Sequence, residues 1–192
     1  DEGVFLVMEL VAGKTLREPA EPGDVVRAYR QCGEGLAAAH AAGLIHRDFK
    51  PENAIRGDDG RVRVLDFGLA REVSEAHDIA GTPRYMAPEQ RAGKPLTAAV
   101  DQYALCASLR ESLDARVPRW LEPVLARGTA PAPEARYPSM RALLDALDPG
   151  SKWKWRALAV AGVVAVGAVI AAFTLGRAGR EAPSCDGGEA LI

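Results

Sequence analysis

The sequence is poor in the residues that build metal centres and disulfide frameworks. Three histidines and three cysteines occur in its 192 residues, and Cys32, Cys106 and Cys185 lie far apart, with no CxxC pair. A structural zinc site needs clustered thiols or imidazoles, and a disulfide scaffold needs several cysteines at short spacing. The pattern favours ordinary thiols in a reducing compartment, with Cys185 set apart because it follows an uncharged segment.

An excess of charge of either sign is also lacking. The 24 basic and 26 acidic residues give a formal net charge of −2. Proteins that bind nucleic acid through their overall field are usually strongly basic. Nucleic acid is therefore not an expected partner.

Long uncharged runs are rare, and the one that stands out is 157–176. As a helix, about 20 residues at about 1.5 Å each would span about 30 Å, the thickness of the hydrocarbon core of a membrane. Trp153 and Trp155 precede it, where interfacial aromatic residues are common. A buried core helix is the alternative, but little sequence follows that could cover it. We expect one transmembrane helix over 157–176.

The charges beside this run predict its orientation. Three basic residues lie in 150–156, a basic and aromatic juxtamembrane segment, and two lie in the tail 177–192. Because basic residues favour the cytoplasmic side, residues 1–156 are expected in the cytoplasm and 177–192 outside. The expected location is the cell membrane, crossed once.

Secondary structure can be predicted for the rest of the chain. Apolar residues recur at helical spacing from Asp24 to Ala42, and Gly43 stands where a glycine commonly ends a helix. Short strands over 54–55 and 61–65 flank the turn 57–60 and predict a hairpin. The other predicted elements are a strand over 4–10 and helices over 98–113, 118–127 and 139–147, with Ser139 capping the last and Pro149 following it.

The segment His46-Arg47-Asp48-Phe49-Lys50-Pro51-Glu52-Asn53 follows the long predicted helix. Phosphoryl transfer needs a carboxylate that orients the attacking hydroxyl, a cation beside the moving phosphoryl group, and oxygen ligands for Mg²⁺. Asp48, Lys50 and Asn53 supply these three groups within one loop.

Two further motifs follow in order. Asp66-Phe67-Gly68 comes directly after a predicted strand, so its carboxylate can reach a metal ion that bridges phosphates. Ala87-Pro88-Glu89 follows the stretch 81–86. One tripeptide alone is weak evidence, but three motifs in this order leave little room for coincidence.

Together these motifs resemble those of bacterial transmembrane serine/threonine protein kinases of the eukaryotic-like protein kinase family. The resemblance covers residues 1–149, a partial kinase domain with the hinge and C-terminal lobe. It implies an α+β, protein-kinase-like fold: a mainly helical C-lobe with a small β element, the N-lobe largely missing, followed by the transmembrane helix. Lys50 two residues after Asp48, and Gly81-Thr82 before Tyr85, match the serine/threonine pattern.

The resemblance also implies roles. Asp48 would be the catalytic base, Lys50 would contact the γ-phosphate, and Asn53 and Asp66 would hold Mg²⁺. ATP and Mg²⁺ are the implied cofactors. The expected partners are ATP, proteins with Ser or Thr acceptors and the lipid bilayer, and a homodimer is compatible with the resemblance.

Supporting roles are implied for other residues. For adenine, Met8 would be the gatekeeper, Glu9 and Val11 would offer backbone hydrogen bonds, and Ile55 would lie beneath the ring. His46 would stack on Phe67, and Gly68 would close its motif. Arg47 would bind an activation-loop phosphate, and the Thr82 hydroxyl would bond to Asp48 and Lys50. Glu89 would pair with Arg136, and Asp101 would hold the catalytic-loop backbone. His40 is interpreted as a packed residue at a helix end.

Two parts that such kinases carry are not found in the sequence. There is no GxGxxG loop with its strand lysine and helix glutamate, and after Leu113 roughly 30 residues are missing by family analogy. Because the chain opens with Asp1 and an apolar run, it is expected to be a fragment. It is expected to be inactive in isolation because half of the nucleotide site is absent from this sequence. The alternative is a pseudokinase or decayed remnant that acts as a membrane-anchored scaffold or binding protein.

Overall fold

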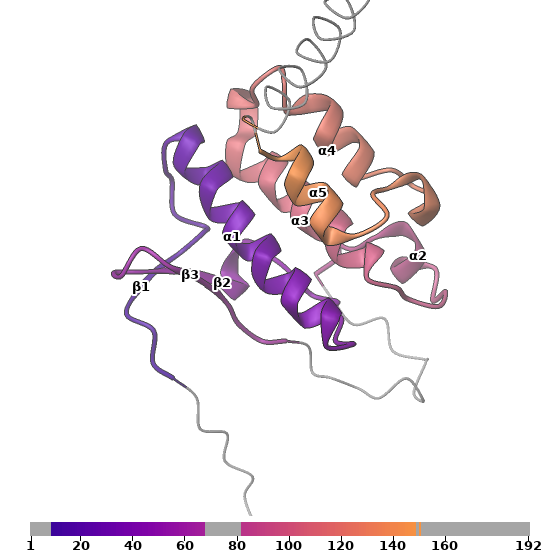
Figure 1. The fold of residues 1–192 in the computed structure, drawn as a ribbon, viewed down its shortest axis with the longest axis horizontal. Coiled ribbons are helices and arrows are strands. Elements are labelled where there is room, and N and C mark those ends of the chain that lie inside the picture. Colours follow the sequence, from indigo (N-terminus) through magenta and orange to yellow (C-terminus); the bar gives the residue numbers. More distant parts are fainter. Residues whose placement is uncertain (1–8, 68–81, 149, 151–192) are drawn as a thin grey trace, which may run out of the picture. The chain divides into compact units, whose positions relative to one another are not determined.

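The structure is a computed structural model of the 192-residue chain, and it describes residues 9–67, 82–148 and 150. The chain divides into two compact units, Asp1–Asp148 and Pro149–Ile192. Only Gly150 of the second unit is described, so the architecture below is that of the first (Figure 1).

The described part of the first unit is mainly helical with one small sheet. The α-helices are α1 (Pro22–Ala41), α2 (Pro88–Arg91), α3 (Ala99–Leu113), α4 (Glu122–Gly128) and α5 (Met140–Ala146), and the 3-10 helices are η1 (Pro51–Asn53), η2 (Asp114–Arg116) and η3 (Pro133–Ala135). The strands are β1 (Gly13–Thr15), β2 (Ala54–Gly57) and β3 (Val62–Val64), and they form an antiparallel sheet in the order β1-β2-β3.

The long helix α1 forms where its sequence pattern predicts it. Pro22 occupies the first turn, where its missing amide costs no hydrogen bond. Gly43 adopts a φ of 78°, and the amides of Gly43 and Leu44 donate to the carbonyls of His40 and Ala39. This is a Schellman ending, which satisfies carbonyls that the helix itself leaves without partners.

The core lies between α1, α3, α4 and α5. Helix α1 packs against α5, α3 and β3, and α3 also packs against α4. The buried face of α1 includes Val26, Tyr29, Cys32 and Leu36. Each large apolar side chain buried in this way contributes about 1.5–3 kcal/mol relative to exposure, so the interface fixes the end of α1 from which the catalytic loop departs.

The sheet places the second half of the site. Strands β2 and β3 pair with Ala54 opposite Val64 and Arg56 opposite Val62, which confirms the predicted hairpin. The short strand β1 was not predicted, and it pairs its Thr15 with Ile55. Helix α5 has Ser139 as its N-cap, with the Ser139 hydroxyl accepting from the Ala142 amide at 3.1 Å, as predicted.

One predicted helix begins later than expected. The pattern predicted a start at Pro118, whereas α4 begins at Glu122. A helix from Pro118 would place Pro123 in its interior, where proline removes a hydrogen bond and clashes with the preceding turn. Instead Pro123 lies in the first turn of α4, and Leu121 closes a turn onto the Pro118 carbonyl at 2.8 Å.

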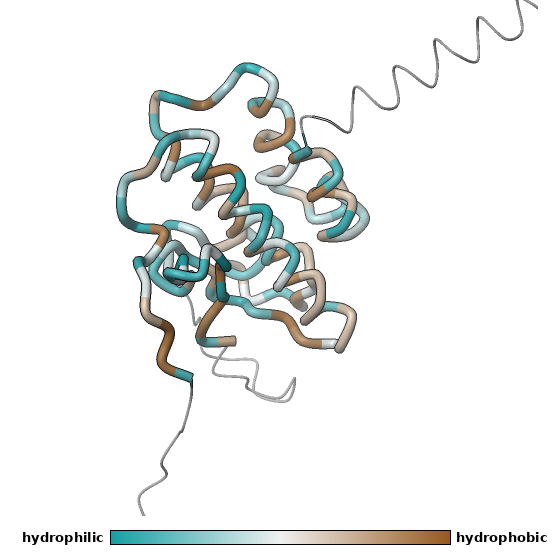
Figure 2. Tube along the Cα trace, turned by 60° about the vertical axis from the view of Figure 1, so that its left-hand side comes forward, coloured by the Kyte–Doolittle hydropathy of each residue, from teal (hydrophilic) through white to brown (hydrophobic). Residues whose placement is uncertain are grey.

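The expected fold class included a transmembrane helix, and the structure corrects this. Among the residues that it describes, no helix is both long and apolar enough to cross a membrane. Helix α1 has the length, but it carries charged residues along one face, and Figure 2 shows hydrophilic and hydrophobic residues alternating along the described helices. The segment 157–176, on which the prediction fell, lies outside the described residues, as do 151–156 and 177–192. The predicted location stays a prediction.

Candidate active site

The catalytic loop is fixed by a buried carboxylate from α3. Asp101 is fully buried, and its two oxygens accept the backbone amides of His46 and Arg47, each at 2.9 Å. Arg47 has a φ of 68°, a left-handed conformation that is costly for a residue with a side chain. The Gln90 amide group donates to the Arg47 carbonyl at 2.7 Å. The side chains of Asp101 and Gln90 therefore hold the loop backbone just before Asp48 through its amides and a carbonyl.

Asp48, Lys50 and Thr82 form a compact cluster. The Thr82 backbone amide donates to Asp48 Oδ1 at 2.8 Å, and Lys50 Nζ lies 3.2 Å from Asp48 Oδ2. Lys50 Nζ also donates to the Thr82 hydroxyl at 3.2 Å. The hydroxyl thus contacts Lys50 as expected, but the group of Thr82 that reaches Asp48 is the amide. Both charged side chains keep part of their surface open to solvent.

The two predicted metal ligands lie on adjacent backbone segments. Asn53 Nδ2 donates to the Asp48 carbonyl at 3.0 Å, and the Leu65 amide donates to the Asn53 carbonyl at 2.8 Å. Asp66 follows directly, with a φ of 51°. In the described part of the chain, the Asp66 carboxylate enters no hydrogen bond or salt bridge.

This arrangement fits Mg²⁺. The Asn53 side chain uses its nitrogen for the loop, which leaves its oxygen free to face a cation, and Asp66 adds a carboxylate that has no partner among the described residues. Mg²⁺ binds oxygen donors and commonly takes only one or two carboxylates from the protein. Among the described residues, no group of three or more His, Cys, Asp or Glu side chains that could hold a metal ion occurs.

His46 joins the catalytic loop to the Asp66 segment. It is fully buried, and its Nε2 lies 2.9 Å from the Leu65 carbonyl oxygen. Its ring lies 5.0 Å from that of Phe67 and 6.0 Å from that of Phe49, centroid to centroid. The structure thus brings the His46 and Phe67 rings together, whereas Gly68 lies outside the described residues.

Glu89 and Arg136 also meet. Arg136 Nη1 and Nη2 donate to the two Glu89 carboxylate oxygens at 2.6 and 2.7 Å, and Arg136 is 2% exposed. Further bonds from Arg136 reach the carbonyls of Ala130 at 2.8 Å and Ala99 at 2.9 Å.

The predicted adenine-binding residues are only partly described. Met8 lies outside the described residues. Glu9 is exposed and lies 3.7 Å from Arg63, Val11 is half-buried outside any helix or strand, and Ile55 is half-buried in β2. None of the three lines the cavity described below, and their role stays a prediction.

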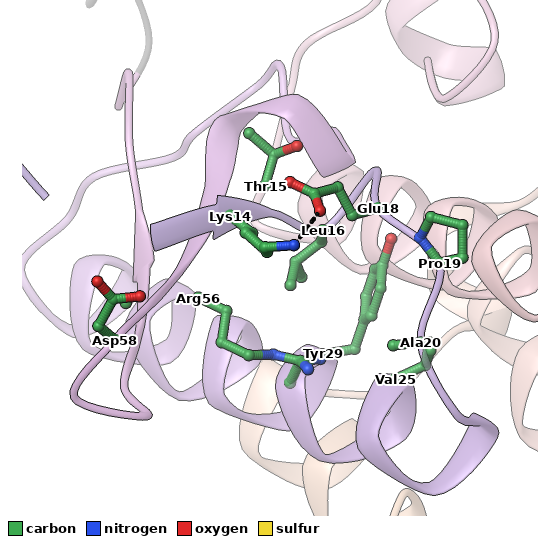
Figure 3. Close-up of a pocket in the computed structure, with 12 residues that line it drawn as sticks. Lys14, Thr15, Leu16, Glu18, Pro19, Ala20, Val25, Tyr29, Arg56 and Asp58 are labelled. Atoms are coloured by element: carbon green, nitrogen blue, oxygen red, sulfur yellow. Dashed lines mark ion pairs between the residues drawn. The ribbon is translucent and has the colours of Figure 1, made fainter. Parts of the chain in front are cut away.

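A cavity of about 190 Å³ lies between β1, β2 and the start of α1 (Figure 3). Its walls include Leu16, Val25 and Tyr29, and the Lys14–Glu18 ion pair of 2.9 Å lies at its rim. None of the residues predicted for catalysis, metal binding or adenine binding lines it. It is therefore separate from the candidate site.

Two residues that support the loop were missed, one of them through Asp101 and the other by direct contact. His40 Nε2 lies 2.6 Å from Asp101 Oδ2, and Gln90 holds the Arg47 carbonyl. His40 and Asp101 are far apart in the sequence, so no local pattern could have paired them. Gln90 follows Glu89 directly, and a polar residue beside a motif was the only signal available for it.

The site combines a buried carboxylate that fixes a loop, a carboxylate–lysine pair open to solvent, and two side chains whose oxygen atoms suit Mg²⁺. These are the features of the C-lobe of a protein kinase. The comparison with known families agrees. The chain belongs to the protein kinase domain family, whose model matches residues 1–126.

The chain is also similar to curated bacterial kinases. It is 52% identical over 97 residues to serine/threonine-protein kinase PknL of Mycobacterium tuberculosis, which covers 45% of this chain and 24% of that protein. It is 36% identical over 162 residues to serine/threonine-protein kinase Pkn1 of Myxococcus xanthus, 73% of this chain and 23% of that protein. The chain thus spans about a quarter of the length of these relatives. The predicted membership of the protein kinase family is confirmed.

Proposed function

We propose that the protein transfers the γ-phosphoryl group of ATP to Ser or Thr hydroxyls of other proteins in bacterial signalling. The observation that carries the proposal is the environment of Asp48. One of its carboxylate oxygens accepts the Thr82 amide, and the other faces Lys50. A carboxylate held in this way can orient an acceptor hydroxyl, while the neighbouring ammonium group faces the moving phosphoryl group.

Each residue of the cluster has a distinct task in this proposal. Asp48 accepts the proton of the attacking hydroxyl at a carboxylate oxygen. Lys50 places its positive charge where negative charge spreads over the phosphoryl oxygens, and the Thr82 hydroxyl keeps its Nζ in place. Asn53 and Asp66 are proposed to hold Mg²⁺, which when bound supplies charge neutralisation between the phosphates.

The test compares wild-type protein, as its gene encodes it, with Asp48→Asn. Transfer from γ-labelled ATP to Ser- and Thr-containing peptides is measured with Mg²⁺ and with EDTA. We expect Mg²⁺-dependent transfer by the wild type and a loss of about 10²–10⁴-fold in Asp48→Asn, the range for removal of a general base. The matched control is Asp145→Asn, the same change at an exposed position of α5, which should retain wild-type turnover.

Two results would contradict the proposal. The absence of transfer by the wild-type protein would favour a scaffold or binding role. Near wild-type turnover in Asp48→Asn would show that the base lies elsewhere.

A further inference from the structure

The cavity between β1, β2 and the start of α1 has no part in the candidate active site (Figure 3). Its volume of about 190 Å³ is well above the about 10–15 Å³ that a single water molecule needs. Protein interiors are close-packed and rarely leave voids of this size. Sites for drug-sized ligands measure about 300–1,000 Å³, so this cavity suits a smaller molecule with a single ring.

Much of the lining is apolar and buried. Leu16, Val25 and Ala28 line the cavity, and each is less than one-tenth exposed. The Tyr29 side chain is 1% exposed, and its hydroxyl already bonds the Ser112 hydroxyl at 2.8 Å, so only its ring is available to a ligand. A flat apolar ring packs well against aromatic and aliphatic side chains of this kind.

Arg56 adds a positive charge to this lining. It is half-buried in β2, and its Nη2 donates to the Asp24 carbonyl at 3.3 Å. Within the described part of the chain, Arg56 forms no salt bridge. A guanidinium has five N–H donors, and partial burial without a counterion removes water that would otherwise bond to them. An anion in the cavity would supply the missing acceptors.

The other charged residues of the lining do not compensate Arg56. Lys14 and Glu18 pair with each other at 2.9 Å, so their charges cancel. Asp58 is exposed, and Figure 3 shows the Arg56 side chain extending toward Tyr29, with Asp58 on the opposite side. The cavity thus combines an apolar lining with an uncompensated guanidinium.

We propose that this cavity is a binding site for a small aromatic carboxylate. The ring packs against the apolar lining, and the carboxylate accepts two parallel N–H bonds from Arg56, the geometry in which guanidinium groups commonly bind carboxylates. A neutral ligand of the same shape gains the apolar contact without the charged one. The site is separate from the Asp48 cluster, so the proposal does not rest on phosphotransfer.

The experiment measures the binding of benzoate to the wild-type protein, as its gene encodes it, by NMR titration. Benzamide is the neutral probe of the same shape. We expect saturable benzoate binding with a Kd of about 1 mM or lower, and about tenfold weaker binding of benzamide, because hydrogen bonds to charged groups are the stronger ones. NOEs from the benzoate ring should reach the methyl groups of Leu16 and Val25. No saturation, equal affinity for the two probes, or NOEs to other residues alone would overturn the proposal.

Arg56→Met keeps a side chain of similar length and removes the charge. Benzoate should bind this variant about tenfold more weakly, at the level of benzamide, and Arg56→Lys should retain a preference for benzoate. The matched control is Arg61→Met, since Arg61 belongs to the same hairpin, is exposed and does not line the cavity. Unchanged affinity in Arg56→Met, or an equal loss in the control, would contradict the role of Arg56.

Two further readouts separate the site from variant folding and from the nucleotide site. Mg²⁺ and ATP should leave benzoate binding unchanged, and displacement would place benzoate in the candidate active site and overturn the proposal. If circular dichroism shows that Arg56→Met does not fold, the NOEs of the wild-type protein still decide whether the cavity is the site. A protein that transfers no phosphate would leave this result unaffected.

Discussion

The guanidinium of Arg136 and the carboxylate of Glu89 face each other in a two-bonded salt bridge, with both pairs of atoms within 2.7 Å. Arg136 also donates to backbone carbonyls near α3 and α4, and its guanidinium carbon lies 5.1 Å from the centre of the Tyr103 ring. The bridge joins α2, which follows the catalytic segment, to the chain just before α5. It is a structural tie between distant parts of the lobe.

Removing one partner of this bridge should be costly. Arg136→Met leaves the Glu89 carboxylate buried and unpaired, which typically costs about 3–5 kcal/mol of stability. The measurement is urea unfolding followed by circular dichroism. The matched control is Arg110→Met, since Arg110 pairs with Glu122 at 2.9 Å on an exposed surface, where such a pair contributes at most about 1 kcal/mol. Equal losses in the two variants would show that the buried bridge is no stronger than a surface pair.

Thr82 allows the two contacts of the catalytic cluster to be separated. Thr82→Val keeps the backbone amide that donates to Asp48 and removes the hydroxyl that accepts from Lys50. If the proposed phosphotransfer is correct, we expect turnover to fall about tenfold, or about 1.4 kcal/mol in the barrier. Thr82→Ser should retain it. The measurement is the steady-state rate at saturating ATP, and unchanged turnover in Thr82→Val would show that Lys50 needs no anchor.

Replacement of Asp114 by glycine should raise the stability of the protein. It ends α3 with φ 49° and ψ −132°, a combination that strains any residue with a Cβ. Asp114→Gly removes that strain at the cost of a more flexible unfolded chain, so we expect a net gain of about 1 kcal/mol and a rise in Tm of about 2–4 °C. Asp114→Ala keeps the Cβ and should bring no gain. A lower Tm in Asp114→Gly would mean that the aspartate side chain stabilises this turn.

The two buried thiols predict a loss of stability in alkaline solution. Burial raises the pKa of Cys32 to about 12 and that of Cys106 to about 12. In the unfolded chain thiols ionise near a pKa of about 8.5, so above that pH the unfolded state binds fewer protons than the folded state. The free energy of unfolding is therefore fully maintained below pH ~8.5 and falls as pH rises toward 12. Each thiol contributes up to about 1.4 kcal/mol per pH unit.

Urea unfolding between pH 8 and 10 under reducing conditions tests this prediction. Cys32→Ala should have a shallower slope than the wild type, because one of the two thiols is gone. The same slope in both proteins would show that Cys32 does not ionise on unfolding in this range. Burial also raises the pKa of the Tyr29 hydroxyl, and ionisation of unfolded tyrosine adds to the loss near pH 10.

The sequence predicted the parts of the fold that have a local cause. Proline in the first turn, apolar spacing and glycine after the end define α1 from within its own residues, and Ser139 does the same for α5. The strand β1 could not be predicted, because three residues have no measurable period and their order comes from pairing with β2. The late start of α4 depends on the competing effects of Pro118 and Pro123.

The candidate site also has parts that the local sequence predicts and parts that it does not. The motif residues could be found because their chemistry is concentrated in short segments of sequence. The contact of His40 with Asp101 could not, because it depends on how α1 crosses α3, and neither residue signals the other. The use of the Thr82 amide in place of its hydroxyl is a matter of backbone direction, which residue identity does not encode.

The packing of α1 against α5 has a consequence for synthesis of the chain. Roughly 100 residues separate the two helices, so at about 5–20 residues per second the ribosome delivers the second about 5–20 s after the first. During that interval α1 can pack against β3 and α3, which are made earlier, but the surface that it buries against α5 has no partner. Apolar surface exposed on an incomplete chain favours chaperone binding and aggregation. The yield of folded protein should therefore depend on how quickly translation reaches α5, as well as on the stability of the finished lobe.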